Sequence, residues 1–266
     1  MHEQKAMEGQ SALVTGSTGG LGLAIAEKFA SLGASVLLHG LLLQAEGEVL
    51  AREVAARNGA KVLYRHADVS RLEELAALMD HAAAALNGPD ILVNNAVIRH
   101  FGPIESQKPG DWDLDIAVNL TAAFHTIRLA LPGMRSRGWG RIFNLSSVYG
   151  MRGAAGRVGY VTTKTALLGL TRAVAAETLR DPITCNALCP GTVPTPNIEQ
   201  RIAAEMDARG ETDRDAAVAA FLQGKQPSGR FVEAEKVAAM AAFLCSPAAD
   251  DITGTAIPID GGWSAT

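Results

Sequence analysis

Cysteine is scarce in this chain: its 266 residues include three, at Cys185, Cys189 and Cys245. Cys185 and Cys189 stand four residues apart in a segment with the pattern of a β-strand, where about 3.3 Å per residue would separate them by ~13 Å. A disulfide requires a Cα separation below ~7 Å, which excludes this pair. An odd number of cysteines without metal-ligand spacing indicates reduced thiols and a cytosolic setting.

The chain also lacks an excess of basic residues, a metal-ligand cluster and long apolar runs. Its formal net charge of -4 argues against nucleic acid as a partner. The six histidines form no HxxxH or Cys/His cluster, so we predict no metal site. No stretch approaches the ~18 uninterrupted apolar residues of a membrane span, and Met1 to Ala6 lack the apolar run of a signal peptide. We therefore expect a cytoplasmic protein without a membrane partner.

What the chain does have is 48% hydrophobic residues against 20% charged ones, enough for a sizeable core. Short apolar runs alternate with longer segments of helical periodicity. The predicted strands are residues 11–15, 35–39, 61–64, 91–94, 141–145, 184–188 and 256–259. The predicted helices are residues 21–31, 44–57, 71–86, 112–137, 160–179 and 233–246. This alternation predicts one doubly wound α/β domain over residues 1–266, in which helices cover both faces of a seven-stranded parallel sheet.

The first predicted strand runs directly into a glycine-rich turn, Thr15-Gly16-Ser17-Thr18-Gly19-Gly20-Leu21-Gly22, and then into an alanine-rich helix. Gly16, Gly20 and Gly22 give the spacing GxxxGxG. Glycine permits a tight turn and close approach of the backbone to a pyrophosphate, and the helix N-terminus offers unpaired N–H groups to that anion. The strand–turn–helix context predicts a dinucleotide site, with a purely structural glycine turn as the alternative.

A tyrosine and a lysine stand one helical turn apart, at Tyr160 and Lys164, and Ser147 lies thirteen residues before the tyrosine. Positions i and i+4 share a helix face, so Lys164 can hold its positive charge close to the phenol. A nearby cation favours the phenolate, and such a tyrosine can take a proton from an alcohol or return one to a ketone. The pair predicts an oxidoreductase, although a packed tyrosine beside a solvated lysine would show the same spacing.

These motifs together resemble the short-chain dehydrogenase/reductase family over essentially the whole chain. The matching pieces, in the family's order, are the glycine turn, Asp68-Val69, Asn94-Asn95-Ala96, Asn119, Ser146-Ser147, Tyr160 with Lys164, Pro190-Gly191 and Asp260-Gly261-Gly262-Trp263. The resemblance implies a Rossmann-type fold, an NAD(P)-dependent enzyme that interconverts secondary alcohols and ketones, and a homotetramer. Trp263, near an apolar chain end, is expected to be buried in the pocket or against a neighbouring subunit.

The resemblance also implies a catalytic role for four residues. Tyr160 would be the general acid/base, and Lys164 would favour its phenolate form and hold the nicotinamide ribose. Ser147 would hydrogen-bond the substrate oxygen and stabilise the charge that develops there. Asn119 would hold a water that connects Lys164 to solvent for proton relay.

Cofactor contacts follow from the same resemblance. Within the turn, the residues implied to hold the cofactor are Thr15, Gly16, Ser17, Thr18, Gly20, Leu21 and Gly22. Asp68 and Val69 would border the adenine, while Asn95 and Ala96 would line its ribose. The residues implied to flank the nicotinamide are Pro190, Gly191, Val193 and Thr195.

The residues expected at the adenosine end of the cofactor indicate whether the enzyme uses NAD or NADP. A 2′-hydroxyl is normally bound by an acidic residue ~20 residues after the turn, and a 2′-phosphate by a nearby arginine. The second strand ends at His39-Gly40-Leu41-Leu42-Leu43, which has neither, and Gly19 stands where NADP-dependent relatives often carry Arg or Lys. We therefore expect NAD, although His39 could contribute a partial positive charge. Val97 replaces the family's usual glycine and could shift the ribose or narrow the pocket.

The C-terminal third resembles bacterial D-3-hydroxybutyrate dehydrogenases, in Lys225-Gln226-Pro227-Ser228, Phe231-Val232 and Ile252-Thr253-Gly254-Thr255. Those enzymes hold a carboxylate with a Gln, a His, a Lys and a lid Gln. The matching positions here are Arg99, Tyr149, Arg157 and Arg201, and Thr192 replaces a tryptophan. Arginine is always charged and binds carboxylates bidentately, so we expect a small-molecule substrate: a 3-hydroxybutyrate-like or larger hydroxy acid. The alternative is that these arginines point to solvent or pair with acids.

Residues 194–229 interrupt the alternation with a polar, helical insertion. Its place beyond a strand's carboxyl end suits a lid over the substrate, and the alternatives are an oligomer contact or helices without a function of their own. Two other functions stay open: a sugar or polyol dehydrogenase of the same fold, and a nucleotide-sensing regulator that has lost chemistry. The regulator is disfavoured because Ser147, Tyr160 and Lys164 are all present.

Overall fold

The computed structural model describes residues 5–265, and seven strands form one parallel sheet in it, as predicted. The strands are β1 (Ser11–Val14), β2 (Ser35–Gly40), β3 (Val62–His66), β4 (Ile91–Asn94), β5 (Gly140–Leu145), β6 (Ile183–Pro190) and β7 (Ala256–Ile259). Their order is β3-β2-β1-β4-β5-β6-β7, so the winding reverses between β1 and β4. In open α/β sheets, ligands bind in the crevice at this reversal, outside the carboxyl ends of the strands.

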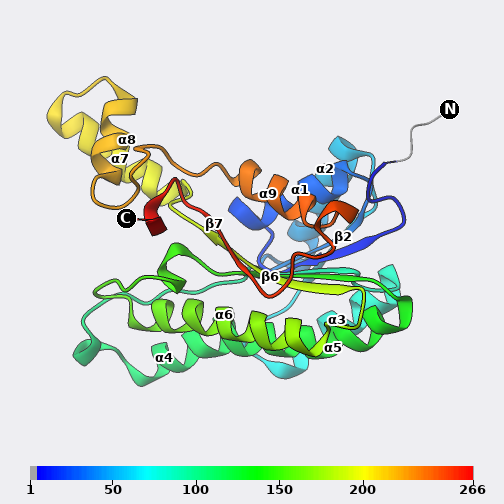
Figure 1. Cartoon of the computed structure of the whole chain (residues 1–266). Helices are drawn as coiled ribbons and strands as arrows, with labels where there is room; N and C mark the ends of the chain where they lie inside the picture. The colour runs from blue at the N-terminus through cyan, green and yellow to red at the C-terminus, as the bar shows by residue number, and fades with distance from the viewer. Residues whose placement is uncertain (1–4, 266) are drawn as a thin grey trace.

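Helices cover both faces of the sheet (Figure 1). The helices that enclose the sheet are α1 (Gly20–Ser31), α2 (Gln44–Asn58), α3 (Leu72–Leu86), α5 (Ala122–Arg137), α6 (Val158–Glu177) and α9 (Ala234–Phe243). One core cluster packs α1, α2 and α9 against the sheet around Ile25 and Phe29. A second packs α3, α5 and α6 against the other face around Leu78 and Met134. The doubly wound architecture is therefore confirmed.

The predicted helix over residues 112–137 differs from the observed one. It begins earlier, at Pro109, and consists of α4 (Pro109–Ile116), a π-helical turn η2 (Ala117–Thr121) and α5. By length and composition alone this run is apolar enough to cross a membrane. Its apolar character is explained by packing, because Ala122, Ile127 and Met134 lie buried in the core beneath the sheet.

The insertion forms two helices, α7 (Pro196–Arg209) and α8 (Arg214–Leu222), which stand apart from the sheet beside the end of β7 (Figure 1). They share a small apolar cluster of their own, built on Ile202, Val218 and Leu222. Thr195 caps α7 by accepting a hydrogen bond from the Ile198 amide at 3.3 Å. The helical character of residues 194–229 is thus as predicted, and their role as a lid stays a prediction.

Candidate active site

The glycine turn connects β1 to α1 through backbone that needs glycine. Gly16 and Gly20 have φ angles of 62° and 54°, in the left-handed region. A Cβ on Gly22 would lie 2.4 Å from the Gly16 carbonyl oxygen and 2.5 Å from Nδ2 of Asn95. The N-cap of α1 is Gly19, which has no side chain to cap the helix, so the first-turn amides of α1 are free to donate hydrogen bonds to an anion.

Side chains that were predicted to touch the cofactor brace this turn. Thr15 Oγ1 accepts hydrogen bonds from the amides of Asn95 and Ala96, at 2.9 and 3.0 Å. Asn95 Nδ2 donates to the carbonyls of Thr15 and Gly16, at 3.0 and 2.8 Å. Ser17 Oγ donates to the Val14 carbonyl at 2.7 Å. These contacts fix the turn to the end of β4 and bring the predicted pyrophosphate and ribose residues together.

His39 lies under the same turn and corrects one expectation. Its Nδ1 accepts a hydrogen bond from the Gly16 amide at 3.0 Å, so the ring proton is on Nε2, which donates to the Ala67 carbonyl at 2.9 Å. Burial lowers the pKa of His39 to about 4. The ring is therefore neutral near pH 7 and offers no positive charge to a 2′-phosphate, contrary to the possibility raised from the sequence.

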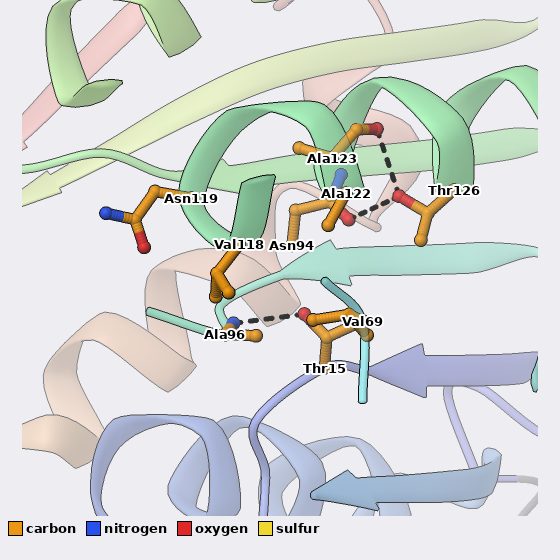
Figure 2. A pocket seen from close by; sticks show the side chains of 9 residues that line it. All are labelled: Thr15, Val69, Asn94, Ala96, Val118, Asn119, Ala122, Ala123 and Thr126. Atoms are coloured by element: carbon orange, nitrogen blue, oxygen red, sulfur yellow. Dashed lines mark hydrogen bonds between the residues drawn. The ribbon is translucent and has the colours of Figure 1, made fainter. Parts of the chain in front are cut away.

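A small cavity lies where the strand order reverses (Figure 2). It is lined by Thr15, Val69, Asn94, Ala96, Val118, Asn119, Ala122, Ala123 and Thr126. Thr126 Oγ1 donates to Asn94 Oδ1 at 2.6 Å, which holds α5 against β4. Predicted cofactor contacts from β1, β3 and β4 thus converge on the helical run that carries Asn119. Asp68, next to Val69, accepts hydrogen bonds from both the amide and the hydroxyl of Ser70.

The predicted catalytic residues are all buried where β5 and α6 meet η2. Tyr160, Lys164, Ser147 and Asn119 are each less than a tenth exposed. Lys164 Nζ lies 5.6 Å from the centre of the Tyr160 ring and donates to the Leu145 carbonyl. Burial, and secondarily the positive charge of Arg99, lower the pKa of Lys164 to about 7. Ser147 begins a 3₁₀ turn that packs against α6, and its Oγ accepts the Tyr149 amide at 3.2 Å.

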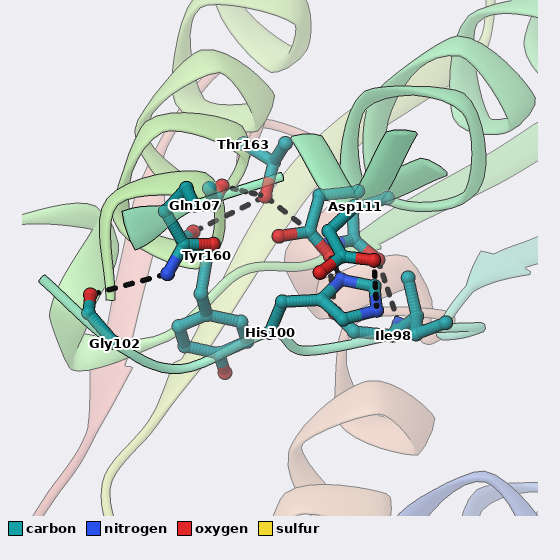
Figure 3. Close-up of polar contacts among 10 residues, drawn as sticks. Ile98, His100, Gly102, Gln107, Asp111, Tyr160 and Thr163 are labelled. Atoms are coloured by element: carbon teal, nitrogen blue, oxygen red, sulfur yellow. Dashed lines mark hydrogen bonds and ion pairs between the residues drawn. The ribbon is translucent and has the colours of Figure 1, made fainter. Parts of the chain in front are cut away.

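Asn119 has a positioning contact that the sequence did not reveal. Its Oδ1 accepts the Ile98 amide at 2.8 Å, and its Nδ2 donates to the Ile98 carbonyl at 3.0 Å and to Thr163 Oγ1 at 3.3 Å. Both N–H donors of the amide are therefore occupied, so the relay water that the resemblance implies could contact Asn119 only by donating a hydrogen bond to one of its oxygen atoms. Figure 3 shows how Thr163 and Tyr160 on α6 lie beside the segment of Ile98 and His100. Asn119 thus fixes α6 to the loop after β4.

Three of the predicted substrate residues, Arg99, Tyr149 and Arg157, lie together beside Tyr160, whereas Arg201 lies over the ring of Phe221 and Thr192 contacts Gln226. The guanidinium of Arg99 lies over the Tyr160 ring, with Cζ 5.0 Å from its centre. Arg157 Cζ lies 4.7 Å from the centre of the Phe101 ring and 5.3 Å from that of Tyr149. The Tyr149 and Tyr160 rings meet edge to face at 6.4 Å. In the residues that the structure describes, Arg99 and Arg157 form no salt bridge with a carboxylate.

The turn after β6 is held by a residue whose role sequence reasoning missed. Buried Gln226 accepts the Thr192 amide through Oε1 at 2.8 Å and donates to the Arg230 carbonyl. A Cβ on Gly191 would lie 2.6 Å from that oxygen. The predicted nicotinamide segment Pro190–Thr195 is therefore joined directly to the end of the lid. A buried glutamine has no sequence signature beyond its place in a matching motif.

Two further residues at the site have structural contacts. Trp263 is buried within the chain, and its ring packs edge to face on Tyr149 at 5.2 Å. This resolves the expectation that Trp263 is covered either by the pocket or by a neighbouring subunit, in favour of the pocket. Arg152 donates to the Trp263 carbonyl, which gives that exposed arginine a structural role. Val97, which replaces the family's usual glycine, lies just beyond β4 and is 38% exposed, and its effect on the ribose or the pocket stays a prediction.

Comparisons with known proteins agree with this geometry. The family model described as enoyl-(acyl carrier protein) reductase matches residues 16–264. The D-beta-hydroxybutyrate dehydrogenase of Cupriavidus necator is 42% identical over 97% of this chain and 99% of its own length. The enzyme of the same name from Rhizobium meliloti is 40% identical over 96% of this chain and 99% of its own length.

Among solved structures, the L-sorbose reductase of Gluconobacter frateurii, complexed with NADPH and L-sorbose, superimposes with a TM-score of 0.91. It is 30% identical and covers 99% of this chain and 100% of its own. Full-length similarity thus accompanies a glycine turn, a buried serine, tyrosine and lysine, and the sheet order of dinucleotide-binding enzymes. The protein belongs to the short-chain dehydrogenase/reductase family and is an oxidoreductase that acts on alcohol and ketone groups.

Proposed function

We propose that the protein is an NAD-dependent dehydrogenase that interconverts a small hydroxy acid and its keto acid. The observation that carries the proposal is the guanidinium of Arg99 over the ring of Tyr160, 5.0 Å from its centre. An arginine without a carboxylate partner among the described residues, beside the proposed general base, suits a substrate whose carboxylate lies close to the reacting hydroxyl. The similarity to D-beta-hydroxybutyrate dehydrogenases supports the same substrate class.

The site fits a nicotinamide dinucleotide. The left-handed glycines of the turn and the uncapped first turn of α1 leave room and amide donors for a pyrophosphate. Thr15, Gly16, Ser17, Thr18, Gly20, Leu21 and Gly22 would hold it, with Asp68, Val69, Asn95 and Ala96 at the adenosine and Pro190, Gly191, Val193 and Thr195 at the nicotinamide. When bound, the nicotinamide would supply the acceptor for the hydride that leaves the alcohol carbon.

The chain's own residues would handle the proton. Ser147 would donate a hydrogen bond to the substrate oxygen and thereby hold the hydroxyl against Tyr160. Tyr160 would take the hydroxyl proton during oxidation and return it during reduction. Lys164, buried one turn along α6, would favour the phenolate and pass the proton onward. Asn119 would keep α6 and the loop after β4 in register, as its hydrogen bonds to Ile98 and Thr163 do now.

NAD is the proposed cofactor because the end of β2 offers no cation to a 2′-phosphate. Leu41 and Leu43 are each 69% exposed there, and His39 is neutral near pH 7. A phosphate dianion against this apolar surface would lose hydration without gaining a counter-charge. NADPH in the L-sorbose reductase structure is the reason to test both cofactors.

The substrate class is tested by following NADH formation at 340 nm with a panel of hydroxy acids and neutral polyols. We expect turnover of hydroxy acids, including D-3-hydroxybutyrate, to exceed that of polyols. Preference for polyols would instead support the second candidate, a sugar or polyol dehydrogenase, which the structural similarity to L-sorbose reductase favours.

We further propose that the enzyme is a cytoplasmic homotetramer. Three buried, unpaired cysteines suit a reducing compartment. Trp112 on α4 and Phe124 on α5 are 37% and 47% exposed, which places apolar surface where another subunit could cover it. Light scattering at micromolar concentration should give a mass well above the 27.8 kDa of one chain.

A further inference from the structure

The guanidinium of Arg157 is held by aromatic rings rather than by a carboxylate. Its guanidinium lies against the rings of Phe101 and Tyr149, with Cζ 4.7 and 5.3 Å from their centres. A cation–π contact with a ring face does not use up the five N–H donors of a guanidinium. In the part of the chain that the structure describes, these N–H groups have no carboxylate partner. The N–H groups of Arg157 are therefore available to an anion.

The lid brings two more cations to the same place. Arg201 on α7 and Lys225 after α8 share the ring of Phe221, with Cζ 5.5 Å and Nζ 4.3 Å from its centre. Burial lowers the pKa of Lys225, and the positive charges of Arg201 and Arg157 lower it further, while Glu205 opposes them. Lys225 is thus within electrostatic range of both arginines. Lys225 therefore shares the Phe221 ring with Arg201 and also feels the charge of Arg157, and Glu205 is the acid that acts on Lys225.

These cations are additional to Arg99. Arg99 is stacked on Tyr160, and Arg157 on the adjacent ring of Tyr149. One bidentate arginine satisfies both oxygens of a carboxylate. A substrate with a single carboxylate at Arg99 would leave Arg157, and the lid pair of Arg201 and Lys225, without a substrate anion, and Glu205 is the acid that acts on Lys225.

We propose that the substrate is a hydroxy diacid, with one carboxylate at Arg99 beside the reacting hydroxyl and a second at Arg157, Arg201 and Lys225. The second carboxylate would join the entrance of α6 to the lid and hold the lid over the site. This inference rests on the proposed hydroxy acid dehydrogenase function and adds the second anionic group to it.

The test compares 3-hydroxyglutarate with its monomethyl ester, which has nearly the same shape but lacks one negative charge. We expect kcat/KM with NAD to be about 10- to 150-fold higher for the diacid, because a hydrogen bond to a charged group contributes roughly 1.5–3 kcal/mol. In Arg157→Gln and Lys225→Gln the preference should fall toward unity. The matched control is Arg209→Gln, which removes a positive charge from the same lid. Arg209 is not among the residues whose charge affects Lys225, so this variant should keep the preference for the diacid over its ester.

A binding measurement separates this inference from the proposed function. Calorimetry on the NAD-saturated enzyme should show at least tenfold tighter binding of glutarate than of butyrate, and Lys225→Gln should remove the difference. Equal binding of the two acids, or equal kcat/KM for the diacid and its ester, would overturn the proposed site for a second carboxylate. Turnover of D-3-hydroxybutyrate in the same experiments would still support the hydroxy acid dehydrogenase function. Turnover of polyols without any hydroxy acid would overturn both.

Discussion

The carboxylate of Asp115 fills the space that a side chain on Gly159 would need: its Oδ2 lies 2.1 Å from the position of a Cβ on that glycine. The other carboxylate oxygen, Oδ1, lies 3.0 Å from Nδ1 of His100, and the Asp115 side chain is buried. Because Gly159 directly precedes Tyr160, this carboxylate links α4, the loop after β4 and the start of α6 at the proposed general base.

Gly159→Ala should therefore lower kcat/KM by about 10- to 100-fold, because displacement of a catalytic group by ~1 Å can cost that much. Adding Asp115→Ala should restore part of the loss, since it removes the atom that the new methyl group meets. Gly169→Ala is the control on the same helix: a Cβ there meets nothing within 4 Å. A double variant as impaired as Gly159→Ala alone would contradict the steric explanation.

Tyr160→Phe should remove nearly all turnover and leave NAD binding largely unchanged. The hydroxyl acts on the reacting oxygen, and loss of general acid–base catalysis typically costs 10²–10⁴-fold in rate. Steady-state rates and fluorescence titration with NADH measure the two quantities separately. Retention of a third of the wild-type rate would exclude Tyr160 as the general acid/base.

Periodicity located the sheet well because each strand is a short apolar run between turn residues. All seven observed strands overlap the predicted ones, and β4 (Ile91–Asn94) and β7 (Ala256–Ile259) coincide with them. The helical run before β5 was less well bounded. Pro109 at the first helical position is a known signal for the start of a helix and could have been used. The π-turn at Ala117–Thr121 continues the same apolar pattern, so the sequence does not distinguish it from α-helix.

The sequence predicted which residues belong to the site, but not which of them contact each other. The spacing of Tyr160 and Lys164 gives their shared face directly, because a helix repeats locally. The stacking of Arg99 on Tyr160 joins residues 61 positions apart, and the contact of Asp115 with Gly159 joins two helices. The neutral state of His39 depends on burial between the turn after β1 and the end of β3. Such properties come from tertiary packing, which no local pattern encodes.

His39 should make the fold sensitive to acid. Burial lowers its pKa from 6.5 to about 4, so the unfolded chain takes up a proton at a higher pH than the folded one. Stability is then fully present above pH 6.5 and falls as the pH decreases toward 4, by roughly 3 kcal/mol in total. Urea unfolding at pH 7, 5.5 and 4 measures this. His39→Asn keeps an acceptor for the Gly16 amide and should reduce the dependence of the unfolding free energy on pH. An unchanged pH dependence would mean that other groups cause it.

Leu41→Arg should improve the use of NADP. The side chain of Leu41 is exposed just beyond β2, so arginine fits there without disturbing the core and supplies a bidentate partner for a 2′-phosphate. Comparison of kcat/KM for NAD and NADP, before and after the substitution, gives the shift in preference. If the unmodified enzyme already prefers NADP, the proposed role of the apolar end of β2 is wrong.

Arg99→Ala should distinguish acid substrates from neutral ones. The guanidinium lies over Tyr160, and Ile98 and His100 on either side of it are fixed by hydrogen bonds to Asn119 and Asp115. Loss of a charge-assisted hydrogen bond worth roughly 1.5–3 kcal/mol should lower kcat/KM for a hydroxy acid by about 10- to 150-fold. A neutral secondary alcohol of similar shape should lose much less, because it has no anion to pair.

Arg172→Ala, on the exposed face of α6, controls for the loss of one positive charge. Equal losses on acid and neutral substrates would mean that Arg99 acts by packing against Tyr160, and the polyol dehydrogenase would then be the better account of the pocket.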